Sequence, residues 1–170
     1  ASQTRAFEEC FIKEGIPYKV VGGLKFYERA EIRDMLAYFR LVLQPSDDLA
    51  FERIINKPAR GIGEKTIDKF RNRAKADAIP LYQAMVSMTS EGAFSGKTKN
   101  ALENFINLMT EWRRIMQAIP LGEFAETIVD ESGYMAMLEQ DKSVEAPGRI
   151  ENIKELISVI VIQTREHQHG

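Results

Sequence analysis

The chain has 170 residues, 44% of them hydrophobic, and a formal net charge of −2, which fits one large or two small globular domains. No apolar run is long enough to span a bilayer, and no basic stretch followed by an apolar one marks a signal peptide. The single Cys10 excludes an internal disulfide and fits a reducing compartment. We therefore expect a cytoplasmic protein without a membrane partner.

The small net charge conceals two oppositely charged regions. Residues 53–75 hold eight lysines and arginines against two acids, a balance of +6, whereas residues 121–170 hold ten acids against four basic residues, a balance of −6. A basic block suits a polyanion such as DNA. A solvated helix face can have the same composition, so charge alone leaves both interpretations open.

The N-terminal part reads as helices around one short strand. Apolar residues at helical spacing predict helices over Ser2–Glu14, Ala30–Leu43 and Leu49–Asn56, and an extended apolar run predicts a strand over Tyr18–Val21. The polar pair Ser46–Asp47 is suited to cap the third of these helices.

The rest of the chain reads as helices separated by prolines, glycines and polar loops. The fold class is therefore all-α, an irregular multi-helix domain with one short N-terminal strand. The further predicted helices are residues 64–76, 81–88, 97–118, 121–131 and 134–140, and a last helix that begins near Gly148.

The most informative motif joins two of these helices. Asn56 and Pro58 end one helix, a Gly61-Ile62-Gly63 turn follows, and the next helix begins near Glu64. Two glycines allow a tight turn and a close approach to another molecule, and the unpaired N–H groups of a helix start suit a phosphate. The layout indicates a helix-hairpin-helix-like element that grips the backbone of nucleic acid without reading its bases.

Other candidate sites are weaker. Gly96-Lys97-Thr98 faintly repeats the glycine, lysine and threonine of the first turn, and two such helix starts could touch two places on a backbone, although these residues favour helix starts in any protein. The spacing of Gly92 and Gly96 does not fit an ATP-binding P-loop. His167 and His169 are poor support for a metal site, and no nucleophile–base pair can be nominated. The chain alone does not look like an enzyme.

Several stretches together resemble the UvrD/Rep/PcrA family of superfamily-one DNA helicases. The most specific of them is Gly-Gly-x-x-Phe-Tyr-Glu-Arg-x-Glu-Ile at residues 22–32. Its order and spacing relative to Arg60-Gly61-Ile62-Gly63 strengthen the resemblance. Residues 2–5, 47–56 and 149–156 are also similar to family segments, and the similarity is weakest between about residues 76 and 145.

The resemblance implies a fragment of a larger ATP-dependent helicase. Residues 1–21 would be the edge of motor subdomain 2A, and residues 22–170 would be the mobile helical subdomain called 2B. The family's ATPase motifs are missing from this chain, so no cofactor is expected in it, and ATP and Mg would be bound by the missing motor domains. The chain alone should then be inactive, and its start at Ala1 looks like a cut.

The resemblance also implies roles for individual residues. Gly61, Ile62, Gly63 and Thr66 would lie against the backbone of duplex DNA, and Arg60 and Lys65 would add phosphate contacts. Arg149 and Asn152 would form a further duplex contact, and Arg5 would lie near single-stranded DNA. Glu28 and Arg29 would belong to the hinge toward the motor, unless they only form a local ion pair at a helix start.

Two functions remain open at this point. The first is an accessory duplex-binding and regulatory subdomain of a 3′–5′ DNA helicase, with partners in duplex DNA, single/double-strand junctions and the rest of the motor. The second is a protein-interaction or autoinhibitory helical module of the same helicase, which uses its acidic C-terminal half and does not bind DNA by itself.

Overall fold

A computed structural model describes residues 24–169, and all regular secondary structure in that range is α-helix, which confirms the predicted all-α class. The predicted helix over residues 2–14, the strand over residues 18–21 and Arg5 lie outside the described residues. The helices are α2 (Leu24–Glu28), α3 (Ala30–Leu43), α4 (Asp48–Ile54), α5 (Glu64–Asp77), α6 (Leu81–Ser90), α7 (Gly96–Ile115), α8 (Leu121–Glu131), α9 (Tyr134–Gln140) and α10 (Ala146–His169).

Three predicted helices, which are α3, α8 and α9, have the observed bounds. The other ends shift by a few residues. The helix α4 ends at Ile54 rather than Asn56, because the Asn56 side chain binds the backbone of Ile62 instead of continuing the helix. The helix α7 ends at Ile115, and α10 begins at Ala146, two residues before the predicted start.

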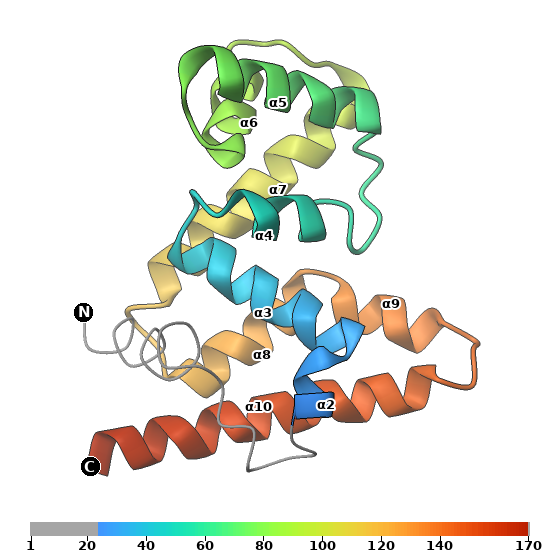
Figure 1. The fold of residues 1–170 in the computed structure, drawn as a ribbon, viewed down its shortest axis with the longest axis vertical. Coiled ribbons are helices and arrows are strands. Elements are labelled where there is room, and N and C mark those ends of the chain that lie inside the picture. Colours follow the sequence, from blue (N-terminus) through green and yellow to red (C-terminus); the bar gives the residue numbers. More distant parts are fainter. Residues whose placement is uncertain (1–23, 170) are drawn as a thin grey trace.

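The helix α3 is the centre of the molecule (Figure 1). It packs against α2, α4, α7, α8 and α10. Ten of its fourteen residues are buried, so it is enclosed on more sides than the apolar stripe of an amphipathic helix requires. Two of the buried residues, Glu31 and Asp34, are acids and need internal partners.

The remaining helices form two groups on either side of α3. Figure 1 shows α5 and α6 at one end beside α4, and α8, α9 and α10 at the other end. The long α7 spans both groups, because it contacts α6, α3 and α8. Aromatic rings join the first group: Phe70 makes edge-to-face contacts with Phe51 and Phe94, at centroid distances of 6.2 and 5.7 Å. None of the described helices is long and apolar enough to cross a membrane.

The predicted cap of α4 is present at Asp47, whose Oδ1 accepts a hydrogen bond from the Ala50 N–H at 3.0 Å. We predict that Asp47→Ala lowers the free energy of unfolding by about 1 kcal/mol, because a helix-start N–H loses its partner. Urea denaturation measures the change. Ser46→Ala, at the exposed neighbouring residue, is the matched control, and an equal loss in the control would contradict the cap.

Candidate nucleic-acid interface

The Asn56 side chain organises the connection from α4 to α5. Its Oδ1 accepts hydrogen bonds from the N–H groups of Ile62 (3.2 Å) and Arg60 (3.4 Å), and its Nδ2 donates to the Ile62 carbonyl. The Ile62 side chain is only 2% exposed and belongs to the hydrophobic core. Ile62 therefore anchors the turn from inside, which differs from the expectation that it lies against DNA.

The two glycines of the turn differ in what they contribute. Gly61 has a φ of +75°, a conformation that side chains other than glycine rarely adopt. Gly63 is the N-cap of α5 and has an ordinary φ of −73°. A Cβ built on either residue would meet no atom of the protein within 4 Å. Both residues are exposed, so they leave bare backbone at the start of α5.

The first turn of α5 comes directly after these two glycines in the chain. Gly63 has no side chain to cap the helix, while the N–H groups of Thr66 and Ile67 bond to the Gly63 carbonyl at 3.1 Å. Lys65 is exposed, and Thr66 is half-buried. The start of α5, which we predicted to bind phosphate, is therefore accessible from solvent.

The Arg60 side chain points into the protein. Its guanidinium donates hydrogen bonds to the carbonyls of Ile54 (2.8 Å) and Ile55 (2.9 Å) and to the Tyr38 hydroxyl. The guanidinium carbon also lies 4.8 Å from the centroid of the Phe105 ring. These contacts differ from the expectation that Arg60 adds a phosphate contact, because both of its terminal nitrogens already have partners.

Most arginines of the basic block are also paired. Arg71 bonds to three acids: Glu52, Glu64 and Asp68. Arg73 bonds to Asp77 and Glu91, and it lowers the pKa of the Glu91 carboxyl. Several of these acids lie outside residues 53–75. The balance of +6 over that window therefore overstates the positive charge available to a ligand.

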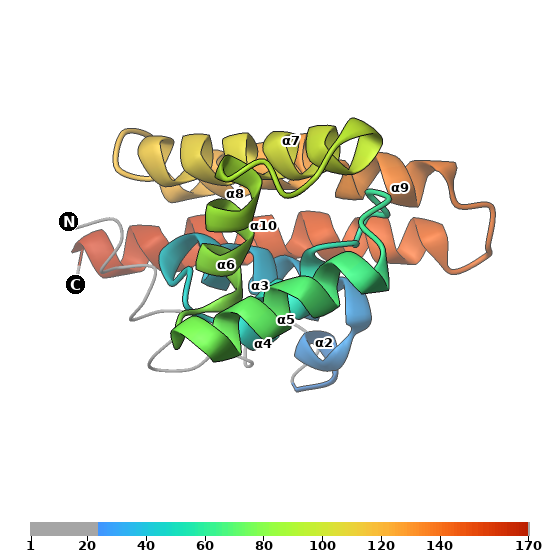
Figure 2. The ribbon, with the colours of Figure 1, turned by 90° about the horizontal axis from the view of Figure 1, so that it is seen from above.

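Three lysines near the helix starts remain without ion pairs to any residue that the structure describes. They are Lys65 on α5 and Lys97 and Lys99 on α7, and all three are exposed. The start of α7 resembles that of α5, because Ser95 makes no side-chain cap and Gly96 has a φ of +62°. In Figures 1 and 2 the first turns of α5 and α7 lie on the same side of the molecule, with the α4–α5 connection.

The second predicted duplex contact consists of Asn152 and Arg149, and the structure places these two residues in different environments. The Asn152 amide donates a 2.8 Å hydrogen bond to the buried Glu31, so it ties α10 to α3 rather than facing a ligand. Arg149 is part-exposed, and its Nη1 lies 3.8 Å from the Asp141 carboxylate. The start of α10, which carries Arg149, lies on the same side as the starts of α5 and α7 (Figure 1).

The proposed hinge residues lie at the junction of α2 and α3. Glu28 ends α2, Arg29 is the N-cap of α3, and both are exposed. Neither side chain forms an ion pair with another described residue. The alternative interpretation as a local ion pair therefore has no support in this geometry.

A buried polar cluster under the turn was not predicted from the sequence. Asp34 accepts hydrogen bonds from Arg53 Nε (2.7 Å) and the Tyr134 hydroxyl (2.6 Å). Burial, followed by the bond to Asp34, raises the pKa of Tyr134, so its hydroxyl stays protonated and donates. A local signal exists in the sequence, because Glu31, Asp34 and Tyr38 recur at helical spacing in a helix whose other residues are mostly apolar.

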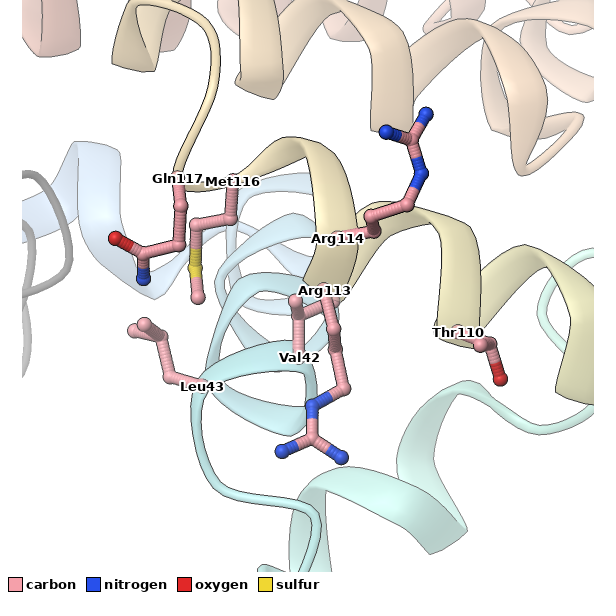
Figure 3. Close-up of a pocket in the computed structure, with 7 residues that line it drawn as sticks. All are labelled: Val42, Leu43, Thr110, Arg113, Arg114, Met116 and Gln117. Atoms are coloured by element: carbon pink, nitrogen blue, oxygen red, sulfur yellow. The ribbon is translucent and has the colours of Figure 1, made fainter. Parts of the chain in front are cut away.

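A groove of about 510 Å³ lies at the opposite end of α7, where it meets the end of α3 (Figure 3). Val42, Leu43 and Met116 supply apolar atoms, and Arg113 and Arg114 lie beside them. Figure 3 shows the two guanidinium groups pointing in opposite directions, so they do not converge on one anion. Basic residues in the last turn of a helix are stabilised by its dipole without a ligand.

The exposed helix starts and the unpaired lysines on one side of this all-helical domain are of the kinds that contact nucleic-acid backbone in other proteins. Comparison with known proteins gives the family. The model of the UvrD-like helicase C-terminal domain matches residues 1–169, and the chain belongs to this family.

Curated relatives agree with this assignment. The chain is 43% identical over 159 residues to a DNA helicase II of Rickettsia typhi, covering 93% of this chain and 24% of the relative. It is 40% identical over 158 residues to the ATP-dependent DNA helicase PcrA of Bacillus subtilis, covering 93% of this chain and 21% of the relative. For the DNA helicase II of Escherichia coli K12, the identity is 36% over 157 residues, covering 92% and 22%. The chain thus spans less than a quarter of each relative's length.

The turn itself gives a stability prediction. Gly61→Ala should lower the free energy of unfolding by about 1–2 kcal/mol, because alanine resists a φ of +75°. Gly63→Ser should leave stability unchanged or raise it by a few tenths of a kcal/mol, since serine suits an N-cap and the site has room for its Cβ. Urea denaturation of both variants checks this. An equal loss of unfolding free energy in both variants would contradict the prediction, because only Gly61 has a positive φ.

Proposed function

We propose that this chain is the duplex-binding accessory part of an ATP-dependent 3′–5′ DNA helicase. Residues 22–170 would form the 2B-like subdomain, and residues 1–21 the edge of motor subdomain 2A. Membership in the UvrD-like helicase family supports this proposal, as do the relatives named DNA helicase II and PcrA. ATP and Mg would bind to the motor domains, outside this chain.

The observation that carries the proposal is the bare backbone at the start of α5. Gly61 and Gly63 are exposed and have no side chains, and the unpaired Lys65 is on the adjacent turn. A DNA phosphate can approach such a helix start closely, accept hydrogen bonds from its N–H groups and gain from the positive end of the helix dipole.

Phosphate contacts at this turn would extend to other helix starts on the same side. Lys97 and Lys99 on the first turn of α7 and Arg149 on the first turn of α10 are cations that could make such contacts, because these helix starts lie on the same side as that of α5 (Figure 1). All of these contacts would be to phosphate, so binding would have little sequence preference. It would be weak, about micromolar or weaker, and it would fall steeply with salt.

The alternative function, a protein-interaction or autoinhibitory module, has an observation in its favour. Exposed acids gather on α8 and α10, including Glu123, Glu126, Glu151 and Glu155. These acids would repel DNA and attract a basic partner. A substitution at Gly63 distinguishes the two functions, because it should weaken DNA binding and leave partner binding at α8 and α10 intact.

Gly63→Ser tests the proposal without disturbing the fold. The serine Cβ would meet no protein atom, but it would occupy the space into which a phosphate must come, and its hydroxyl would compete for the same N–H groups. We predict about tenfold weaker binding of a fluorescent tailed duplex, measured by anisotropy at two salt concentrations.

Thr164→Ser is the matched control, because Thr164 is on α10, and its Oγ1 hydrogen bond to the Ile160 carbonyl (2.9 Å) is one that a serine can keep. This variant should bind like the unsubstituted chain. Unchanged affinity in Gly63→Ser would contradict the proposed contact at the start of α5.

A further inference from the structure

We propose that Arg60 is a positioning residue, which holds the Gly61–Gly63 turn in the shape that meets the DNA backbone and does not itself touch phosphate. This inference rests on the proposed function for its consequence in DNA binding. Its structural part, that Arg60 fixes the turn, can be tested without DNA.

The first argument is the set of partners of the guanidinium. Nη1 donates to the carbonyls of Ile54 (2.8 Å) and Ile55 (2.9 Å), which lie at the C-terminal end of α4, where the Ile54 carbonyl also accepts from the Lys57 N–H at 3.0 Å. A cation at this position also interacts favourably with the negative end of the α4 dipole. Arg60 therefore closes α4 from a residue beyond its end.

The second argument is the environment of the guanidinium plane. It lies over the Phe105 ring of α7 at 4.8 Å from the centroid, and Nη2 donates to the Tyr38 hydroxyl of α3. Nη2 also lies 3.4 Å from the carbonyl of Ser132, at the end of α8. One side chain thus contacts four helices or their ends. A planar fork with several donors can do this, whereas the single ammonium of a lysine cannot.

The third argument is the alternation of inward and outward residues along the turn. Arg60 and Ile62 are anchored inside the protein, and Gly61 and Gly63 are exposed between and after them. The positive φ of Gly61 is therefore fixed from both sides. Without the Arg60 anchor, Ile62 and the Asn56 amide would still hold the turn, but its exposed backbone would sample more conformations.

Arg60→Lys tests this inference, because it keeps the charge and removes the fork. Hydrogen exchange of the free chain should become at least several-fold faster at the amides of residues 60–66, while α8 and α10 keep their protection. Binding of a tailed duplex should weaken about tenfold, but the slope of log K against log salt should stay unchanged, because no phosphate contact is lost.

Two comparison variants make the result specific. Lys65→Ala should lower the salt slope by about one and leave hydrogen exchange of the turn unchanged. Ile128→Val, a small core change on α8, controls for a general loss of stability and should not accelerate exchange at residues 60–66 alone.

The outcomes separate the two proposals. Unchanged hydrogen exchange at residues 60–66 in Arg60→Lys would overturn the positioning role, whether or not the chain binds DNA. A salt slope smaller by about one in Arg60→Gln, which removes the charge, would also overturn it, because Arg60 would then contact phosphate. Faster exchange at the turn, in a chain that binds no duplex, would support Arg60 as the anchor of the turn and would contradict the proposed function.

Discussion

Asp34 and Tyr38 lie one turn apart on the buried helix α3, and the exposed turn depends on the hydrogen bonds that they make. Asp34 is only 2% exposed, so its carboxylate must be compensated by Arg53 and Tyr134. Tyr38 donates a 2.6 Å hydrogen bond to the Lys57 carbonyl and accepts one from Arg60. Burial of these groups is costly without partners, which favours one arrangement of α4, the turn and α9 around α3.

The glycines of the turn can be exposed because the residues next to them are anchored inside the protein. Arg60 and Ile62 are held from inside, so Gly61 and Gly63 can present backbone to solvent without a side chain of their own. The cations suited to a phosphate are lysines at helix starts. Among the arginines of the same region, Arg53, Arg71 and Arg73 form ion pairs, and Arg60 bonds to carbonyls and the Tyr38 hydroxyl. This division is chemically reasonable, because arginine makes the better fork for carbonyls and carboxylates, and lysine acts as a mobile point charge.

Much of the fold could be predicted from the sequence, since helix ends are marked by local signals. The bounds of α3, α8 and α9 and the Asp47 cap follow from apolar spacing, glycine, proline and short polar residues. The inward orientation of Arg60 could not be predicted in this way, because its partners on α3, α7 and α8 are distant in sequence.

The charge available to a ligand and the role of Asn152 could not be predicted for the same reason, because the partners involved are distant in sequence. Arg53 is neutralised by Asp34, nineteen residues away, and Asn152 is occupied by Glu31, which is 121 residues away. A count of charges within a window treats such residues as available to a ligand. The spacing of Glu31, Asp34 and Tyr38 was the one local sign that polar partners would be needed inside the core.

The central claim is that duplex DNA meets the chain at the starts of α5 and α7. Hydrogen-exchange mass spectrometry of the unsubstituted chain, with and without a saturating tailed duplex, tests this claim most directly. Our account predicts DNA-dependent protection at residues 61–66 and in the first turn of α7, with α8 and the middle of α10 unchanged. Protection confined to α8 and α10, or none at the turn while the duplex is bound, would contradict it.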